Sequence, residues 1–167
     1  MNRRDIVIGL LFLIILSGVV IWRARINSKN KEELIVPQTL SVEDQLEERF
    51  NLKIPEDVDK VELKDVTGGT ASGIATRKFE NGKFELSILS DLSDPTEGKF
   101  YQAWLVKGNE GEEGYTTVSL GKLILAKGGW ILNYNSKTDY REHNRVLVSL
   151  EKALDKNLEA KVLDGKF

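Results

Sequence analysis

The chain has 167 residues, 41% hydrophobic and 30% charged with no cysteine, which is the composition of a globular protein without disulfides, thiolate metal sites or cysteine nucleophiles. Its net charge of −2 is uneven: residues 1–31 carry six basic residues and one acid, whereas the remainder carries 18 basic and 25 acidic residues. An acidic domain is a poor partner for phosphate backbones, so nucleic acid is not expected to bind.

A long apolar run lies near the N-terminus. Ile6 to Trp22, IVIGLLFLIILSGVVIW, contains 17 residues without a charge, and arginines flank it on both sides. A helix of this length spans roughly 25 Å, at the short end for a bilayer. A buried core helix and a cleaved signal peptide are the alternatives, but no convincing cleavage site is present. We expect residues 1–26 to form a membrane anchor that contacts the lipid bilayer.

The flanking charges bear on the orientation of this anchor. Four basic residues between positions 23 and 31 outnumber the two before the run, and a bare positive-inside count would place the C-terminal side in the cytoplasm. An N-terminal signal anchor with an arginine pair commonly exports the chain on its C-terminal side. We therefore expect a single-pass protein of the cell membrane with its C-terminal domain outside the cytoplasm.

Residues 27–57 form a polar juxtamembrane linker in which a short helix is expected. Ser41 can cap that helix, with Asp44 as its third residue in a capping-box-like start. Along the expected helix, one face carries an apolar stripe made of Val42, Leu46 and Phe50. The helix is either a partner-binding element or a short helix docked on the domain or loose in the linker, and we favour the second interpretation.

From residue 58 onward the periodicity favours strands. The Asn81-Gly82 pair predicts a hairpin in which Ser72 to Phe79 pairs with Lys83 to Leu89. Further strands are expected at Phe100 to Val106, Val118 to Leu125, Trp130 to Tyr134, Val146 to Leu150 and Val162 to Phe167. The sequence thus predicts an all-β domain over residues 58–167, an antiparallel β-sandwich of about seven or eight strands.

The strand FYQAWLV is apolar on both faces. Tyr101 and Leu105 fall on one face and Trp104 and Val106 on the other, as expected of a central strand. Tyr101 and Trp104 are either a ligand platform or core aromatics, and the core is the favoured interpretation.

Residues with ligand or catalytic chemistry are sparse. His143 is the only histidine and is expected in a solvated loop; its spacing supports neither a Ser-His-Asp arrangement nor a histidine metal site. Two acidic groups are candidate cation sites but have the pattern of solvated loops: Asp91, Asp94 and Glu97, and Glu110, Glu112 and Glu113. Gly68, Gly69 and Gly73 lack the Lys-Ser/Thr pair of a phosphate loop. No catalytic, cofactor-binding or metal residue is predicted, and no enzyme is expected.

A family resemblance rests on strand and turn motifs. KFYQAWLVKG, then VSLGKL, GGW and VLVSLEKALDKNLEAKVLDGKF, resembles the C-terminal domain of RskA-type anti-sigma-K factors over roughly Gly73 to Phe167. The resemblance implies an extracytoplasmic β domain behind a single transmembrane helix, which in that family comes after a cytoplasmic sigma-binding segment. Only MNRRD precedes the apolar run here, so we expect no sigma-binding segment in this chain.

Two functional classes suit these features. The first is a regulatory or sensor module that binds another membrane or envelope protein, without a sigma-binding segment of its own. The second is a passive envelope domain, structural or adhesive, with no signalling role. Neither requires a cofactor.

Overall fold

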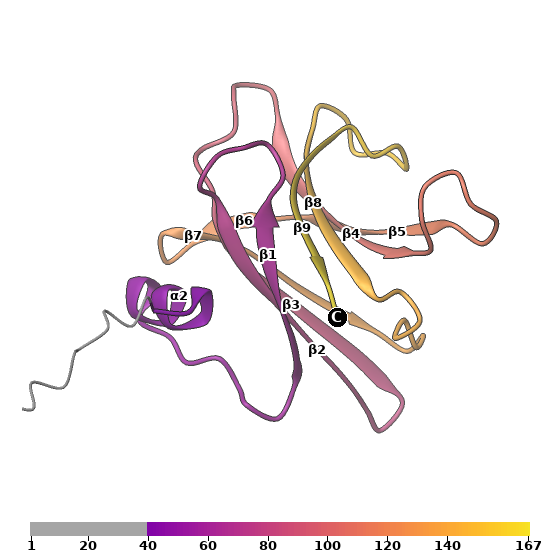
Figure 1. The fold of residues 1–167 in the computed structure, drawn as a ribbon, viewed down its shortest axis with the longest axis horizontal. Helices are drawn as coiled ribbons and strands as arrows, with labels where there is room; N and C mark the ends of the chain where they lie inside the picture. Colours follow the sequence, from indigo (N-terminus) through magenta and orange to yellow (C-terminus); the bar gives the residue numbers. More distant parts are fainter. Residues whose placement is uncertain (1–39) are drawn as a thin grey trace, which may run out of the picture. The chain divides into compact units, whose positions relative to one another are not determined.

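The computed structural model describes residues 40–167, which contain one short helix and nine strands. They are α2 (Val42–Phe50), β1 (Asp59–Asp65), β2 (Ser72–Glu80), β3 (Lys83–Asp91), β4 (Phe100–Lys107), β5 (Thr116–Lys122), β6 (Ile124–Ala126), β7 (Gly129–Ser136), β8 (Arg145–Glu151) and β9 (Ala160–Lys166) (Figure 1). The anchor expected at residues 1–26 and the linker before Leu40 lie outside this description. The helix found within residues 40–167, α2, has nine residues, too few to span a bilayer.

Every strand pairing is antiparallel, which confirms the predicted all-β antiparallel class. The strands form one sheet in the order β5-β4-β8-β9-β1-β2-β3-β7-β6, where two packed sheets were expected. Nine strands exceed the expected seven or eight, partly because the predicted run from Val118 to Leu125 divides into β5 and β6. The sheet curls so that it is nearly a barrel.

The division between β5 and β6 is what brings the sheet ends together. β5 pairs with β4 at one end of the sheet, and after Leu123 the chain pairs as β6 with β7 at the other end. At the crossing, the Leu123 N–H donates to the Tyr101 carbonyl at 2.9 Å. Gly121 has φ +110°, and the β4–β5 register shifts between Ala103 and Trp104. Such a bulge bends a strand, and the positive φ favours glycine at this position.

The β2–β3 hairpin forms as predicted. Its register pairs Phe79 with Phe84 and Glu80 with Lys83, so Asn81 and Gly82 make the turn. Both turn residues have positive φ, 52° and 72°, as this two-residue turn requires.

The main core lies on the inner face of the curled sheet. Its fully buried large side chains come from strands far apart in the sheet order, among them Leu63, Phe84, Leu86, Leu105 and Leu163. Across the closure, the Tyr101 and Trp130 rings meet edge to face at 5.3 Å between centroids. These contacts join the β4 side of the sheet to the β7 side.

Helix α2 packs on the outer face of β2 and β3 (Figure 1). The predicted capping box is present: the Asp44 N–H donates to Ser41 Oγ at 3.1 Å, and the Asp44 carboxylate accepts from the Ser41 N–H. The predicted stripe faces the sheet, with Leu46 and Phe50 buried and Val42 packed against the same cluster. The structure therefore shows the docked helix rather than a loose one.

Candidate functional site

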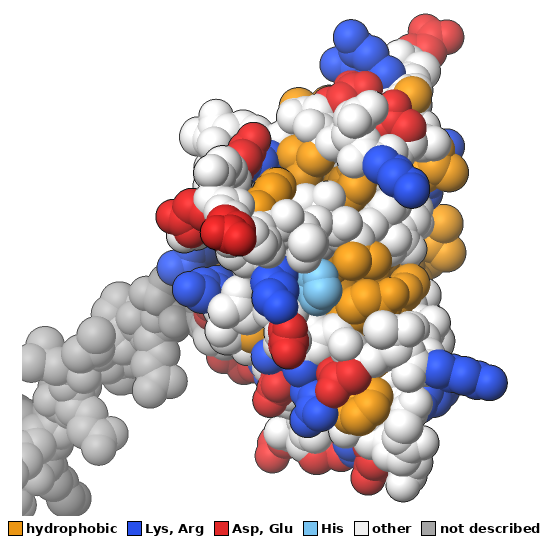
Figure 2. Space-filling view, turned by 90° about the vertical axis from the view of Figure 1, so that its right-hand side faces the viewer, with side chains coloured by type: hydrophobic (Ala, Val, Ile, Leu, Met, Phe, Trp, Pro, Cys, Tyr) orange, Lys and Arg blue, Asp and Glu red, His pale blue; other side chains and the backbone are white. Residues whose placement is uncertain are grey.

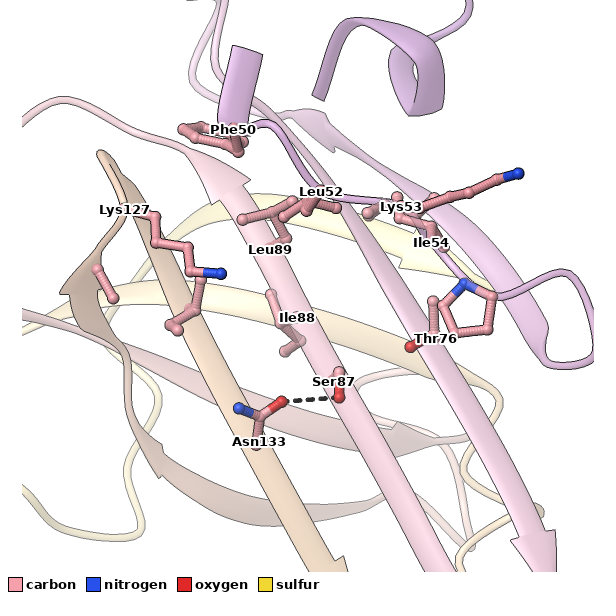
Figure 3. A pocket seen from close by; sticks show the side chains of 14 residues that line it. Phe50, Leu52, Lys53, Ile54, Thr76, Ser87, Ile88, Leu89, Lys127 and Asn133 are labelled. Atoms are coloured by element: carbon pink, nitrogen blue, oxygen red, sulfur yellow. Dashed lines mark hydrogen bonds between the residues drawn. The ribbon is translucent and has the colours of Figure 1, made fainter. Parts of the chain in front are cut away.

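An opening lined mainly by apolar side chains lies beside the C-terminal end of α2, over β2, β3 and β7. We call it the α2 groove (Figure 3). Its volume is about 270 Å³. The residues that line it are Phe50, Leu52, Lys53, Ile54, Pro55, Ile74, Thr76, Ser87, Ile88, Leu89, Ala126, Lys127, Ile131 and Asn133.

The strand register builds the floor of the groove as two parallel rows. Residues directly opposite each other in a sheet project to the same face. One row is apolar and crosses β2, β3, β7 and β6 at Ile74, Leu89, Ile131 and Ile124. The next row is polar and crosses β2, β3 and β7 at Thr76, Ser87 and Asn133. An apolar strip thus lies next to hydroxyl and amide groups.

The wall of the groove is the end of α2 and the segment after it. The chain leaves the helix through Asn51 in the left-handed conformation and returns along the sheet. The Glu47 carboxylate accepts a hydrogen bond from the Ile54 N–H at 2.6 Å, which fixes this return. Leu52 and Ile54 consequently line the groove.

Helix α2 packs on the sheet at a glycine of β7, Gly129. A Cβ at Gly129 would lie 2.9 Å from Cε1 and Cζ of Phe50, closer than side chains approach one another. The Phe50 ring therefore packs directly on the β7 backbone. Arg49 also pairs with Asp91 at the end of β3, so α2 is held by packing and by an ion pair.

Among residues 40–167, the only ionisable residues that line the groove are two lysines, Lys53 and Lys127. Neither makes an ion pair within this part of the chain. Figure 3 shows the Lys127 side chain extended toward the interior of the groove, whereas Lys53 extends away from it. The local charge is positive, although the chain after residue 31 carries more acidic than basic residues.

An exposed apolar side chain extends the groove toward the sheet edge. Ile124 is 61% exposed on β6, the last strand in the sheet order, beside β7. Because Ile124 is opposite Ile131, it continues the apolar row beyond the groove. Figure 2 shows a different face, on which hydrophobic side chains lie in separate groups among charged and polar ones.

His143 lies in the loop before β8, as predicted, but it is half-buried rather than solvated. Its Nε2 is 3.2 Å from Thr116 Oγ1, and its ring meets Tyr140 edge to face. Burial, and secondarily the nearby Lys107, lowers the pKa of His143. The expectation of a solvated position was wrong because the Tyr140 ring packs against the imidazole.

The acidic residues considered as cation sites lie in separate places. Asp91 pairs with Arg49, and Glu110 pairs with Lys161 at 2.7 Å, which lowers the pKa of Glu110. Glu112 accepts from the Asn109 side chain. Asp94, Glu97 and Glu113 are loop residues. Among residues 40–167, no group of three potential ligands is close enough to hold a metal.

The glycine-rich stretch after β1 is organised by a carboxylate. The Asp65 carboxylate accepts from the Thr67 N–H at 2.6 Å, the Thr67 hydroxyl at 2.7 Å and the Ala71 N–H at 3.0 Å. The Thr67 hydrogen bonds are the main cause that lowers the pKa of Asp65 to about 2. Gly68 and Gly69 lie in this loop, and Gly73 lies in β2.

Tyr101 and Trp104 are both buried, so the core interpretation is confirmed. Tyr101 faces the inner core, whereas Trp104 lies on the outer face with Val106 and Leu147, packed against Tyr115 and Leu158. The exposed fraction of Trp104 is 1%, which leaves no platform for a ligand.

A buried polar network accompanies Trp104. Its indole N–H donates to Ser149 Oγ at 2.7 Å, and the Ser149 hydroxyl donates to the Glu151 carboxylate. Glu151 also accepts from the Glu159 N–H at 3.1 Å, which ties the chain after β8 to the network. Gln102 donates to Ser119 Oγ at 3.0 Å. These bonds hold the segment between β8 and β9 over Trp104.

The α2 groove could not be identified from the sequence. Its apolar row forms only through the strand register, and Lys127 enters it only because the turn between β6 and β7 lies beside α2. The Gly-Gly-Trp motif was the one available signal, since Gly129 is where Phe50 packs. In comparisons with known proteins, no family model, curated protein or solved structure matches this chain.

Proposed function

We propose that this protein is a membrane-anchored regulatory or sensor module that binds another membrane or envelope protein outside the cytoplasm. The observation that carries the proposal is the α2 groove, an open apolar strip continued by exposed Ile124 on β6. Contiguous apolar surface is uncommon on a soluble domain and typically marks an interaction site.

The groove is built on a rigid support, which favours binding. Its wall is fixed by the hydrogen bond between Glu47 and Ile54, and its floor is regular β-sheet. A preformed surface loses little conformational entropy when a partner binds. Exposed apolar groups held in this way are suited to a protein partner.

The resemblance to the C-terminal domain of anti-sigma-K factors supports the same proposal. In that family the domain is extracytoplasmic and lies after one transmembrane helix, and Ile6 to Trp22 would supply that helix here. We propose that the curled sheet is the extracytoplasmic β domain that the resemblance implies. Signals would then pass laterally to the helix of a partner or be read by proteolysis.

A crosslinking pull-down tests this function. The full-length chain would be compared with one that lacks Ile6 to Trp22, in the cells that express it. We expect a specific membrane partner that is lost together with the anchor. Recovery of only wall or surface components with both chains would instead support a passive structural or adhesive domain. Turnover of any substrate by the purified protein would contradict both functions.

A further inference from the structure

We infer that the α2 groove binds an extended peptide segment of the partner, with branched apolar side chains on the row formed by Ile74, Leu89 and Ile131 and a carboxylate at Lys127. The inference rests on the proposed function, because it assumes that the partner is a protein. It adds the chemistry by which the groove would recognise that partner.

The size of the groove favours peptide side chains over a buried small molecule. Its volume of about 270 Å³ is slightly below the roughly 300–1,000 Å³ of typical small-molecule pockets. The apolar row continues beyond the groove to Ile124, which is 61% exposed. An extended segment lying across the strands would cover both the groove and this exposed residue.

The polar row favours a peptide over an acyl chain. Asn133 Oδ1 accepts from Ser87 Oγ at 2.8 Å, and among the described residues its amide N–H groups have no acceptor. A peptide backbone offers carbonyl oxygens to these donors. An acyl chain would cover Asn133 without replacing its hydrogen bonds to water, which costs free energy.

The positive charge at the groove favours an acidic peptide segment. Lys127 extends into the groove, and no carboxylate from residues 40–167 lines it (Figure 3). Positively charged surroundings are unfavourable for a cationic ligand, whereas a carboxylate beside the apolar row would pair with Lys127. An exposed ion pair of this kind changes affinity by up to about fivefold.

The test measures fluorescence anisotropy on the full-length chain in lipid nanodiscs, with empty nanodiscs as the blank. The probes are three labelled heptapeptides with the same leucine, isoleucine and valine core and a single glutamate, glutamine or lysine beside it. The variants are Lys127→Glu and Lys127→Gln. Lys137→Glu is the matched control, because Lys137 is exposed directly after β7 and does not line the groove. Labelled decanoate serves as the acyl probe.

We expect the glutamate peptide to bind most tightly to the unaltered protein. Lys127→Glu should weaken that binding about fivefold or more, Lys127→Gln should weaken it less, and Lys137→Glu should change it less than twofold. The lysine peptide should bind the Lys127→Glu variant better than the unaltered protein.

Equal binding of all three peptides to all variants would overturn the inference, and so would the absence of peptide binding. Binding of decanoate without binding of peptides would assign the groove to an acyl ligand instead. If the pull-down still recovers a membrane partner, any of these results would overturn the inferred peptide binding but not the proposed function.

Discussion

Removal of the Trp104 side chain should strongly destabilise the domain. Trp104 is 1% exposed, packs with Val106 and Leu147, and donates its indole N–H to Ser149 Oγ at 2.7 Å. Trp104→Ala leaves a large cavity beneath the segment between β8 and β9, and such truncations cost about 3–5 kcal/mol. For a domain of this size, that corresponds to a fall in melting temperature of roughly 10–20 °C.

Thermal and urea unfolding of residues 40–167, followed by circular dichroism, would measure this change. Trp104→Phe fills most of the space but removes the indole donor, so its cost should be nearer 1–2 kcal/mol, as is typical of about one lost hydrogen bond. Leu154→Ala is the matched control on the same covering segment, because Leu154 is 60% exposed and its loss should cost under about 0.5 kcal/mol. A melting temperature for Trp104→Ala close to that of Leu154→Ala would refute the burial argument.

Three further predictions concern the packing of α2 on Gly129, the Asp65 loop and the orientation of the chain in the membrane. Gly129→Ala should lower the unfolding free energy by about 1–3 kcal/mol, because the added Cβ would meet the Phe50 ring. The cost should be smaller in a Phe50→Leu background, and equal costs in both backgrounds would contradict the close packing of Phe50 on Gly129. The folded-state pKa of Asp65 is lowered to about 2, so its stabilising effect is present above its ordinary value of 3.8 and is lost as pH falls from about 4 toward 2. The unfolding free energies of Asp65→Asn and the unaltered protein should therefore converge across this window, and a constant difference would show that the loop hydrogen bonds do not act as described. A C-terminal alkaline phosphatase fusion to the full-length chain should be active, whereas an inactive fusion beside an active cytoplasmic reporter would reverse the expected orientation.

Local features of the fold could be predicted from the sequence because they depend on neighbouring residues. The capping box of Ser41 and Asp44 and the turn at Asn81 and Gly82 each depend on a short stretch of chain, and both formed. The apolar alternation around Trp104 predicted a strand buried on both faces, and β4 has that burial.

Long-range features could not be predicted, because they depend on register and on how the sheet closes. The run from Val118 to Leu125 has the pattern of one strand, yet it changes partners at Leu123 and joins the two ends of the sheet. The half-buried state of His143 likewise depends on the packing of Tyr140 against its ring.

The candidate site could not be predicted from the sequence for the same reason. Ile74, Leu89 and Ile131 are separated by 15 and 42 positions along the chain, and only strand pairing places them in one row. Lys127 has no pattern around it that indicates an apolar neighbourhood. Its position in the groove depends on the contact between α2 and the sheet, which no local signal specifies.

The central claim is that the α2 groove is the surface that contacts another protein. The most direct measurement places a photo-crosslinking amino acid at Lys53, which lines the groove and extends away from its interior, in the full-length chain in cells, and at Lys152 as an exposed control after β8. We expect a discrete crosslinked product with one protein partner from position 53, reduced by Lys127→Glu, and no such product from position 152. A product of equal strength from both positions, or none from position 53, would contradict the claim.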